Sequence, residues 1–288
     1  MNMKQWIFSI FVFAFVATSC EKEITTGGAD SSGNVTLSFT TTEADVTRSA
    51  ISGYFSKLNV QVFDATGAKV FDKVKTQTSV DADFGSLSVQ LGEGTYTVVA
   101  VGHSSAVSAT IKSPTVCQFT ASDGRKLTDT FCACQQIVVD GSATDYTLDM
   151  YRAVAMVQFC LQDDDVPANF AQFKMEYSGG SANFNPTTLE GITKSSQSEL
   201  RTATDAQIYQ AFTFPYLSAS GVLKMTCTAL DAAGGVIRQR EWQEVPVTRN
   251  RITTYTGKFF EDGDGQFTQS DFGFVIHADW EGEDTYNF

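Results

Sequence analysis

The residues best suited to acid–base catalysis are scarce, because the chain has only two histidines, His103 and His277. The G-x-S-x-G elbow of a Ser–His–acid hydrolase is also missing from the sequence. His103 ends a predicted strand and is followed by Ser104 and Ser105, a setting that favours capping of a turn over activation of a nucleophile. We therefore expect a protein that is not an enzyme.

Carboxylates are abundant, with 33 acidic residues, so a glycosidase-like pair is neither indicated nor excluded by the sequence. Two acidic runs, at residues 163–165 (DDD) and 262–264 (DGD), carry the oxygen ligands that calcium prefers. Neither run fits the EF-hand loop, which needs Asp at set steps and a final Glu. We interpret both as solvated turns and predict no metal site.

The cysteines point to packing more than to chemistry. After Cys20 come five more, an odd number, so at least one stays free or pairs between chains. Cys132 and Cys134 are two apart and would share one face of a strand. A thiolate metal site would need further ligands, which two histidines hardly supply. We therefore interpret these thiols as small buried hydrophobic groups; the later cysteines are Cys117, Cys132, Cys134, Cys160 and Cys227.

The N-terminus has the pattern of an export signal. Lys4 precedes the apolar run at residues 6–17 (WIFSIFVFAFVA), and small residues then lead to Cys20. The run is too short to cross a hydrocarbon core of about 30 Å as a stable helix. Thr18, Ser19 and Cys20 resemble the lipobox of bacterial lipoproteins, in which that thiol is acylated. We predict that residues 1–19 are removed and that Cys20 carries the lipid; the alternative is an ordinary secretory signal with a coincidental cysteine.

Composition limits the possible partners. The net charge of −13 and the pI of about 4.5 argue against nucleic acid, whose phosphates require a basic surface. Hydrophobic residues make up 42% of the chain and aromatic residues 12%, which is ample for buried cores. Residues 20–33, rich in Gly, Ser, Thr and acids, predict a flexible tether to the membrane. The covalent lipid on Cys20 is the one non-protein group that we expect.

Almost everything after the tether reads as β-structure. Val35, Leu37 and Phe39 alternate with polar residues, which is the period of a half-buried strand. Residues 64–67 (DATG) predict a turn between strands. The predicted strands are residues 35–39, 58–63, 69–71, 84–91, 95–101, 137–139, 146–150, 154–161, 173–177, 208–214, 223–230, 236–242, 251–259 and 272–277.

Many short strands with only five prolines favour an all-β protein built of antiparallel sandwiches. The length allows two such domains, because removal of the signal leaves about 270 residues. We predict an N-terminal β-sandwich at residues 34–150 and a C-terminal β-sandwich at residues 151–288, since the pattern restarts at Tyr151 with a long apolar strand.

Several segments resemble the fimbrial subunits of Bacteroidales, in particular the FimB-like branch of the type V pilus fimbrillins. The most specific pieces are R-x-V-A-M at residues 152–156 and P-V-x-R-N-x-I-T-x-Y-T-G at residues 246–257. Further pieces are FDATGAKV, FGSLSVQLGEGTYTVVAVGHSS and MEYSGGSANFNPTTLEG, and together they cover nearly all of residues 35–260. The resemblance implies two tandem transthyretin-like sandwiches, a lipoprotein precursor carried to the outer membrane, and a role in cell adhesion.

The resemblance also implies assembly with other fimbrial subunits by exchange of β-strands. Two segments could act as donor strands: the one with Val35, Leu37 and Phe39, and a C-terminal one in which Phe272, Phe274 and Ile276 share a face. Both could equally be ordinary core strands. Polymerising members of the family are cut after an arginine that follows the first strand, and Arg48 stands at that place. Arg48 is thus a candidate processing site or a bystander.

A different class of function also fits the sequence, namely a surface lipoprotein that binds host or dietary glycans or another surface ligand. Exposed aromatic residues such as Trp242 or Trp280 would line the carbohydrate site on the sandwich. Trp242 lies in a predicted strand between Glu241 and Gln243, so it could equally belong to a core. A surface component of a glycan uptake system is a third possibility.

Overall fold

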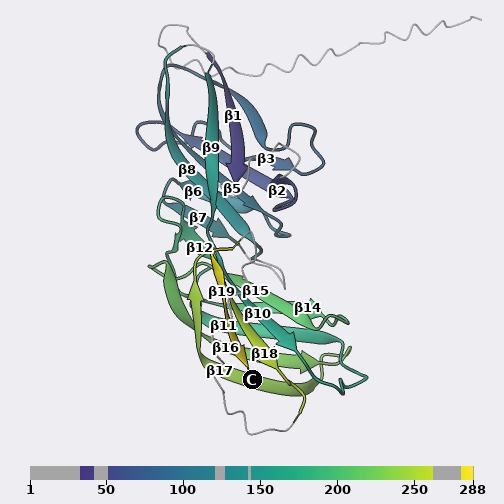
Figure 1. The fold of residues 1–288 in the computed structure, drawn as a ribbon. Helices are drawn as coiled ribbons and strands as arrows, with labels where there is room; N and C mark the ends of the chain where they lie inside the picture. Colours follow the sequence, from purple (N-terminus) through teal and green to yellow (C-terminus); the bar gives the residue numbers. More distant parts are fainter. Residues whose placement is uncertain (1–32, 42–50, 121–126, 142–143, 262–279, 288) are drawn as a thin grey trace, which may run out of the picture. The chain divides into compact units, whose positions relative to one another are not determined.

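The computed structural model describes residues 33–41, 51–120, 127–141, 144–261 and 280–287, and its regular elements are β-strands (Figure 1). No helix long and apolar enough to cross a membrane occurs among these residues. The strands of the first part are β1 (Gly33–Thr41), β2 (Lys57–Phe63), β3 (Lys75–Thr78), β4 (Ser86–Leu91), β5 (Gly94–His103), β6 (Ala109–Ser113), β7 (Val116–Phe119), β8 (Thr130–Val139) and β9 (Thr144–Arg152). Those of the second part are β10 (Ala155–Leu161), β11 (Gln172–Gly180), β12 (Asn183–Asn185), β13 (Glu190–Gly191), β14 (Ser195–Thr202), β15 (Ile208–Thr213), β16 (Ser220–Leu230), β17 (Val236–Thr248), β18 (Arg251–Gly257) and β19 (Gly282–Asn287).

The first sheet has seven strands in the order β3-β2-β5-β8-β9-β1-β4, and it folds back on itself at β9. β9 pairs with β1 along residues 144–150 but meets β8 only through Tyr151 and Arg152 at its end. The strands on the two sides of this fold in the sheet therefore face each other, and one apolar core fills the space between them. β4, β1 and β9 contribute to this core from one side, and β2, β5 and β8 from the other.

Two four-stranded sheets enclose a second core. Their orders are β15-β10-β18-β19 and β14-β11-β16-β17. Phe159 and Tyr255 from the first sheet pack against Phe173 and Trp242 from the second. The alternation of apolar and polar residues in these strands therefore reflects one buried face and one outer face.

A third core covers the other face of β2, β5 and β8. Phe63, Val101 and Cys132 point to this side, and Phe184 and Phe214 from the second part of the chain pack on them. The small sheet β13-β12-β7-β6 joins strands from both parts, since β12 pairs with β7. β5 is consequently apolar on both faces, which explains its continuous run of valines and alanine.

The all-β prediction is confirmed, but the strands are not uniformly antiparallel. β1 pairs in parallel with β9, β10 with β18, and β18 with β19. These partners are joined by long connections, so no hairpin turn imposes the antiparallel direction on them. The domain boundary between residues 150 and 151 stays a prediction; β9 continues across it to Arg152.

The predicted turn at residues 64–67 is confirmed, whereas the strand predicted at residues 69–71 is wrong. Asp64 accepts hydrogen bonds from the amides of Thr66 and Ala68, and Gly67 has a φ of 82°, which favours glycine. Beyond the turn only a single bridge joins Lys69 to Phe63. β3, at Lys75–Thr78, pairs with β2 instead.

Candidate functional site: the first strand and the Arg152 junction

The first strand lies between two others far along the chain. β1, dark purple in Figure 1, pairs antiparallel with β4 from Gly33↔Leu91 to Ser38↔Ser86, and in parallel with β9 from Val35↔Thr144 to Thr41↔Met150. At its end the amide of Phe39 donates to the carbonyl of Gly85 at 3.0 Å. β1 thus holds β4 and β9 together.

The side chains of β1 alternate as the sequence predicted. Val35, Leu37 and Phe39 are buried in the first core, while Thr36 and Ser38 are half-buried on the other face. All three apolar side chains contact the cluster that includes residues of β2, β5 and β8. In the structure β1 is therefore a core strand of its own chain, with its apolar side chains in that chain's first core.

β4 depends on β1 for its place in the sheet. It ends the strand order, and β1 is its single strand partner among the described residues. Loss of β1 would leave unpaired backbone groups on both β4 and β9 and an apolar groove between them. Such a vacancy fits an extended segment with alternating apolar side chains.

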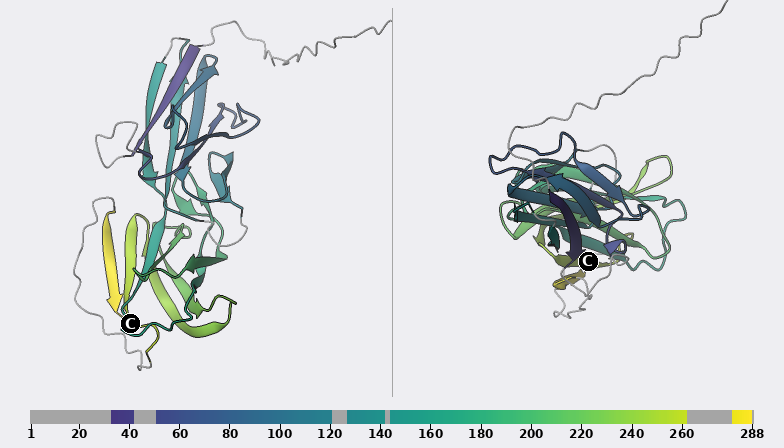
Figure 2. Two further views of the ribbon diagram at one scale, coloured as in Figure 1. Left: turned by 90° about the vertical axis from the view of Figure 1, so that its right-hand side faces the viewer. Right: turned by 90° about the horizontal axis from the view of Figure 1, so that it is seen from above.

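The C-terminal donor strand predicted at Phe272, Phe274 and Ile276 lies outside the described residues. The last described strand is β19, yellow in Figure 2, which pairs in parallel with β18 at the edge of its sheet. Polar contacts hold it: Arg251 pairs with Asp284 at 3.0 Å, and Thr254 bonds to Glu283. Its sequence, GEDTYN, lacks apolar alternation, so the period-two pattern could not reveal it.

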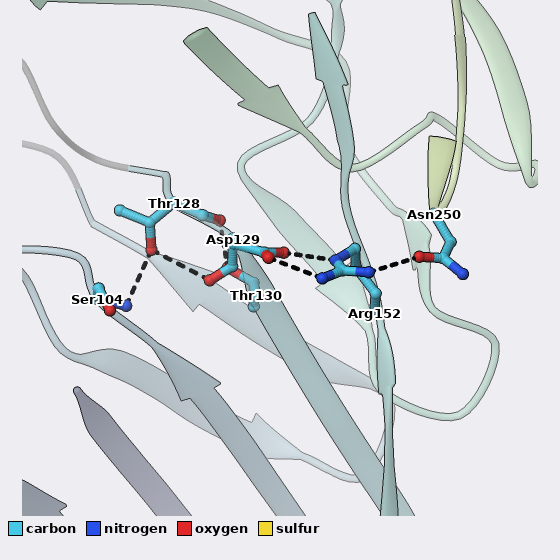
Figure 3. A network of polar contacts seen from close by, with 6 residues as sticks. All are labelled: Ser104, Thr128, Asp129, Thr130, Arg152 and Asn250. Carbon is cyan, nitrogen blue, oxygen red and sulfur yellow. Dashed lines mark hydrogen bonds and ion pairs between the residues drawn. The ribbon is translucent and has the colours of Figure 1, made fainter. Parts of the chain in front are cut away.

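The two most specific sequence motifs meet at Arg152. Its Nε and Nη2 donate to the two carboxylate oxygens of Asp129 at 2.8 and 3.0 Å, and its Nη1 donates to Oδ1 of Asn250 at 2.8 Å (Figure 3). The guanidinium also lies over the rings of Phe131, at 4.6 Å, and Trp280, at 3.9 Å. A buried arginine therefore links four separated segments of the chain.

Backbone hydrogen bonds reinforce this junction. The amide of Ala153 donates to Thr130, that of Asn250 to Val154, and that of Glu281 to Asn250, at 2.8, 2.9 and 2.9 Å. The bidentate Arg–carboxylate pair fixes the orientation as well as the distance. We call this group of residues the Arg152 junction. The sequence showed its motifs but not that they touch.

His103 has the capping role that the sequence suggested. Its Nδ1 accepts the amide hydrogen of Ser105 at 3.1 Å, so Nε2 carries the proton and donates to Oδ1 of Asn59 at 2.7 Å. Burial, with a smaller effect from the charge of Lys57, lowers the pKa of His103 to about 4. The neutral imidazole of His103 stabilises the fold through its hydrogen bonds to Asn59 on β2 and to the amide of Ser105.

The acidic run at residues 163–165 is not wholly a solvated turn, because Asp163 is buried. Asp163 accepts hydrogen bonds from the amides of Phe259 and Phe260 at 2.7 and 2.6 Å, and Asp164 pairs with Lys258 at 2.7 Å. In the described part of the chain no group of three or more His, Cys, Asp or Glu side chains could hold a metal ion. Residues 262–264 lie outside that part.

The cysteines mainly pack as small apolar groups. Cys117, Cys132 and Cys227 are buried, and burial raises the pKa of each of these thiols. Cys132 and Cys134 face the same core, as their spacing predicted, while Cys160 is half-buried. All five are free thiols in the structure.

The two tryptophans proposed for a carbohydrate site both pack against other side chains of the protein. Trp242 is buried in the second core, where it packs on Phe159 and Tyr255. Trp280 covers the guanidinium of Arg152. Cys20 and Arg48, the predicted lipid and processing sites, lie outside the described residues.

Comparison with known proteins identifies the family. The family model of the fimbrillin-A associated anchor proteins Mfa1 and Mfa2 matches residues 25–281. The matched range includes β1 and the Arg152 junction. The chain belongs to this anchor family. The resemblance to fimbrial subunits of Bacteroidales is thereby confirmed. No curated protein matches the chain.

Solved structures similar to this anchor-family chain include the fimbrial anchor protein Mfa2 from Porphyromonas gingivalis, at 15% identity and a TM-score of 0.41 over 73% of this chain and 82% of that one. Another is a fimbrial assembly protein from Parabacteroides distasonis, at 13% identity and a TM-score of 0.42 over 79% and 91% of the two chains. The sequence identities and TM-scores of these structures are low, so the family assignment rests on the family-model match over residues 25–281.

Proposed function

We propose that the chain is a fimbrial subunit, with an anchor or accessory role in cell adhesion, that joins other subunits by strand exchange. One observation carries the proposal: β1 fills an apolar groove between β4 and β9, and it directly precedes the segment that contains Arg48. Membership in the anchor family supports the fimbrial part. Under this proposal the two sandwiches are transthyretin-like domains with no catalytic role.

Lipid attachment would place this subunit on the outer membrane. Cys20 follows a signal-like run and precedes β1 by 13 residues, a tether that includes several Gly and Ser. Acyl chains contribute about 0.8 kcal/mol per buried CH2, so two or more chains would hold the protein permanently. We propose that the lipidated protein lies at the cell surface within the fimbrium.

The state of Arg48 would decide how the subunit joins a fibre. Cleavage there would release residues 20–48, which include β1 and the lipid. The groove could then accept a strand from a neighbour, which would pair with β4 and β9 in place of β1. Without cleavage the groove stays filled and the subunit ends a fibre at the membrane.

N-terminal sequencing and mass analysis of the protein from intact cells test these alternatives. An acylated Cys20 as the sole N-terminus supports the permanent anchor and excludes processing. A mature chain that begins at Ser49 refutes the permanent anchor and makes the protein a polymerising subunit. An Arg48→Ala variant is the matched control, because it must abolish any chain that begins at Ser49 while leaving acylation of Cys20 unchanged.

A surface lipoprotein that binds glycans is the second candidate function. The tryptophans do not favour it, because Trp242 is buried and Trp280 covers Arg152. A different group of side chains, beside the Arg152 junction, does favour it and has the chemistry of a ligand site.

A further inference from the structure

A cleft of about 430 Å3 opens beside the Arg152 junction. That volume lies in the range of small-molecule sites, which combine an apolar surface with a few convergent polar groups. Its walls come from β8, β9 and the segments around residues 187–189, 249–250 and 281. The side chains that matter below are Tyr151, Arg249, Asn250 and Glu281.

Arg249 supplies a guanidinium that forms no ion pair with a described residue. Its Nη1 donates to the carbonyl of Thr188 at 2.9 Å, which fixes the guanidinium at the wall of the cleft. No carboxylate among the described residues lies within ion-pair distance of it. Since a guanidinium has five N–H donors in a planar fork, several remain for a ligand.

Asn250 adds a fixed donor. Its Oδ1 accepts from Arg152, so its amide nitrogen must be the outer atom of the side chain, and it points away from Arg152 in Figure 3. Asn250 also has a φ of 59°, and Leu189 on the cleft wall has a φ of 61°. Asparagine adopts this conformation readily in turns, whereas it is uncommon for a bulky leucine, and uncommon conformations of this kind cluster at functional sites.

Tyr151 and Glu281 complete the set with a ring and an acceptor. Tyr151 is 53% exposed, although it is a large aromatic side chain next to a buried arginine. Glu281 is exposed, and its backbone amide donates to Asn250, which ties its position to the junction. The cleft thus combines an aromatic surface, two donors and one carboxylate acceptor.

We propose that this cleft binds a neutral sugar unit of a glycan. Sugar hydroxyls both donate and accept, so Arg249 and Asn250 can donate to one sugar while Glu281 accepts from it. The weakly polar C–H face of the ring stacks on an aromatic side chain such as Tyr151. The cleft wall carries one positive and one negative side chain, Arg249 and Glu281, and the charge of Arg152 is paired with Asp129, so no net charge selects an ionic ligand.

The inference rests on the glycan-binding candidate and not on strand exchange. β1 contributes no residue to the cleft, so the N-terminal sequencing above and the binding experiment below can fail separately.

The test uses the full chain with Cys20→Ala, kept soluble by the absence of lipid. It is applied to an array of neutral hexose and N-acetylhexosamine glycans beside sialylated and sulfated ones, and hits are measured by saturation-transfer NMR and calorimetry. We expect selective binding of neutral glycans. Arg249→Gln should weaken it about tenfold or more, since a hydrogen bond to a charged group contributes that much. Tyr151→Ala should also weaken it, because it removes the aromatic surface on which the sugar stacks.

The matched controls are Val236→Ala, at a residue that is 65% exposed, and Arg238→Gln, both on β17 and away from the cleft wall. They should bind as the unaltered chain does. Absence of binding to every neutral glycan, exclusive binding of acidic glycans, or equal effects of the control and cleft variants would overturn the proposal.

Discussion

Leu37 at the centre of β1 offers the sharpest test of how firmly this strand is held. Leu37 is fully buried in the first core and stands opposite Leu87 on β4 and Tyr146 on β9. Leu37→Ala removes buried apolar volume and leaves a cavity, which costs about 2–5 kcal/mol at such sites. Because β1 is the strand partner of β4, the loss should appear first as opening of β4.

Hydrogen–deuterium exchange, resolved by peptide, measures that opening. A cost of about 3 kcal/mol in the free energy of opening corresponds to roughly a hundredfold faster exchange. We expect this acceleration in residues 86–91 of β4 and residues 144–150 of β9. Strands β16 and β17, which belong to the second core, should exchange as before.

Thr36→Ala is the matched control, because Thr36 belongs to the same strand but is only half-buried on its other face. It should change exchange in β4 by much less than Leu37→Ala does. Unchanged exchange in β4 after Leu37→Ala, or equal acceleration by both variants, would show that β1 does not hold β4 in place.

Three further predictions concern the anchor, the junction and the buried imidazole. Cys20→Ala should abolish incorporation of labelled palmitate and move the protein to the soluble fraction; continued partition with the outer membrane would contradict lipid attachment there. Arg152→Lys should lower the free energy of unfolding, measured in urea, by about 1–3 kcal/mol, because lysine cannot reproduce the bidentate pair with Asp129, whose side chain is 25% exposed. Lys174→Gln, at an exposed ion pair with Glu176, should lower it by less than about 0.5 kcal/mol. His103 has a folded-state pKa of about 4 against 6.5 unfolded, so stability should be complete above pH 6.5 and fall by about 3 kcal/mol as the pH drops to 4; a His103→Gln variant with the same pH dependence would refute this.

The sequence determined most of what local pattern can encode. Alternating apolar and polar residues revealed β1 and β2, because successive side chains of a strand point to opposite faces, and a continuous apolar run revealed β5. The turn at residues 64–67 followed from side-chain and glycine chemistry, and the shared face of Cys132 and Cys134 from strand geometry. The motifs around Arg152 and Asn250 identified the family, and they proved to be in contact.

Only the tertiary structure decided what pairs with what. The parallel neighbours of β1, β10 and β18, the edge strand β19, and the packing of Phe184 on the first sheet all depend on contacts between residues far apart in the chain. A strand's own sequence records which of its faces is buried but not the direction or identity of its partner, since backbone hydrogen bonds are the same for every residue. For the same reason the Arg152 junction and its cleft, assembled from five distant segments, became visible only in the folded chain.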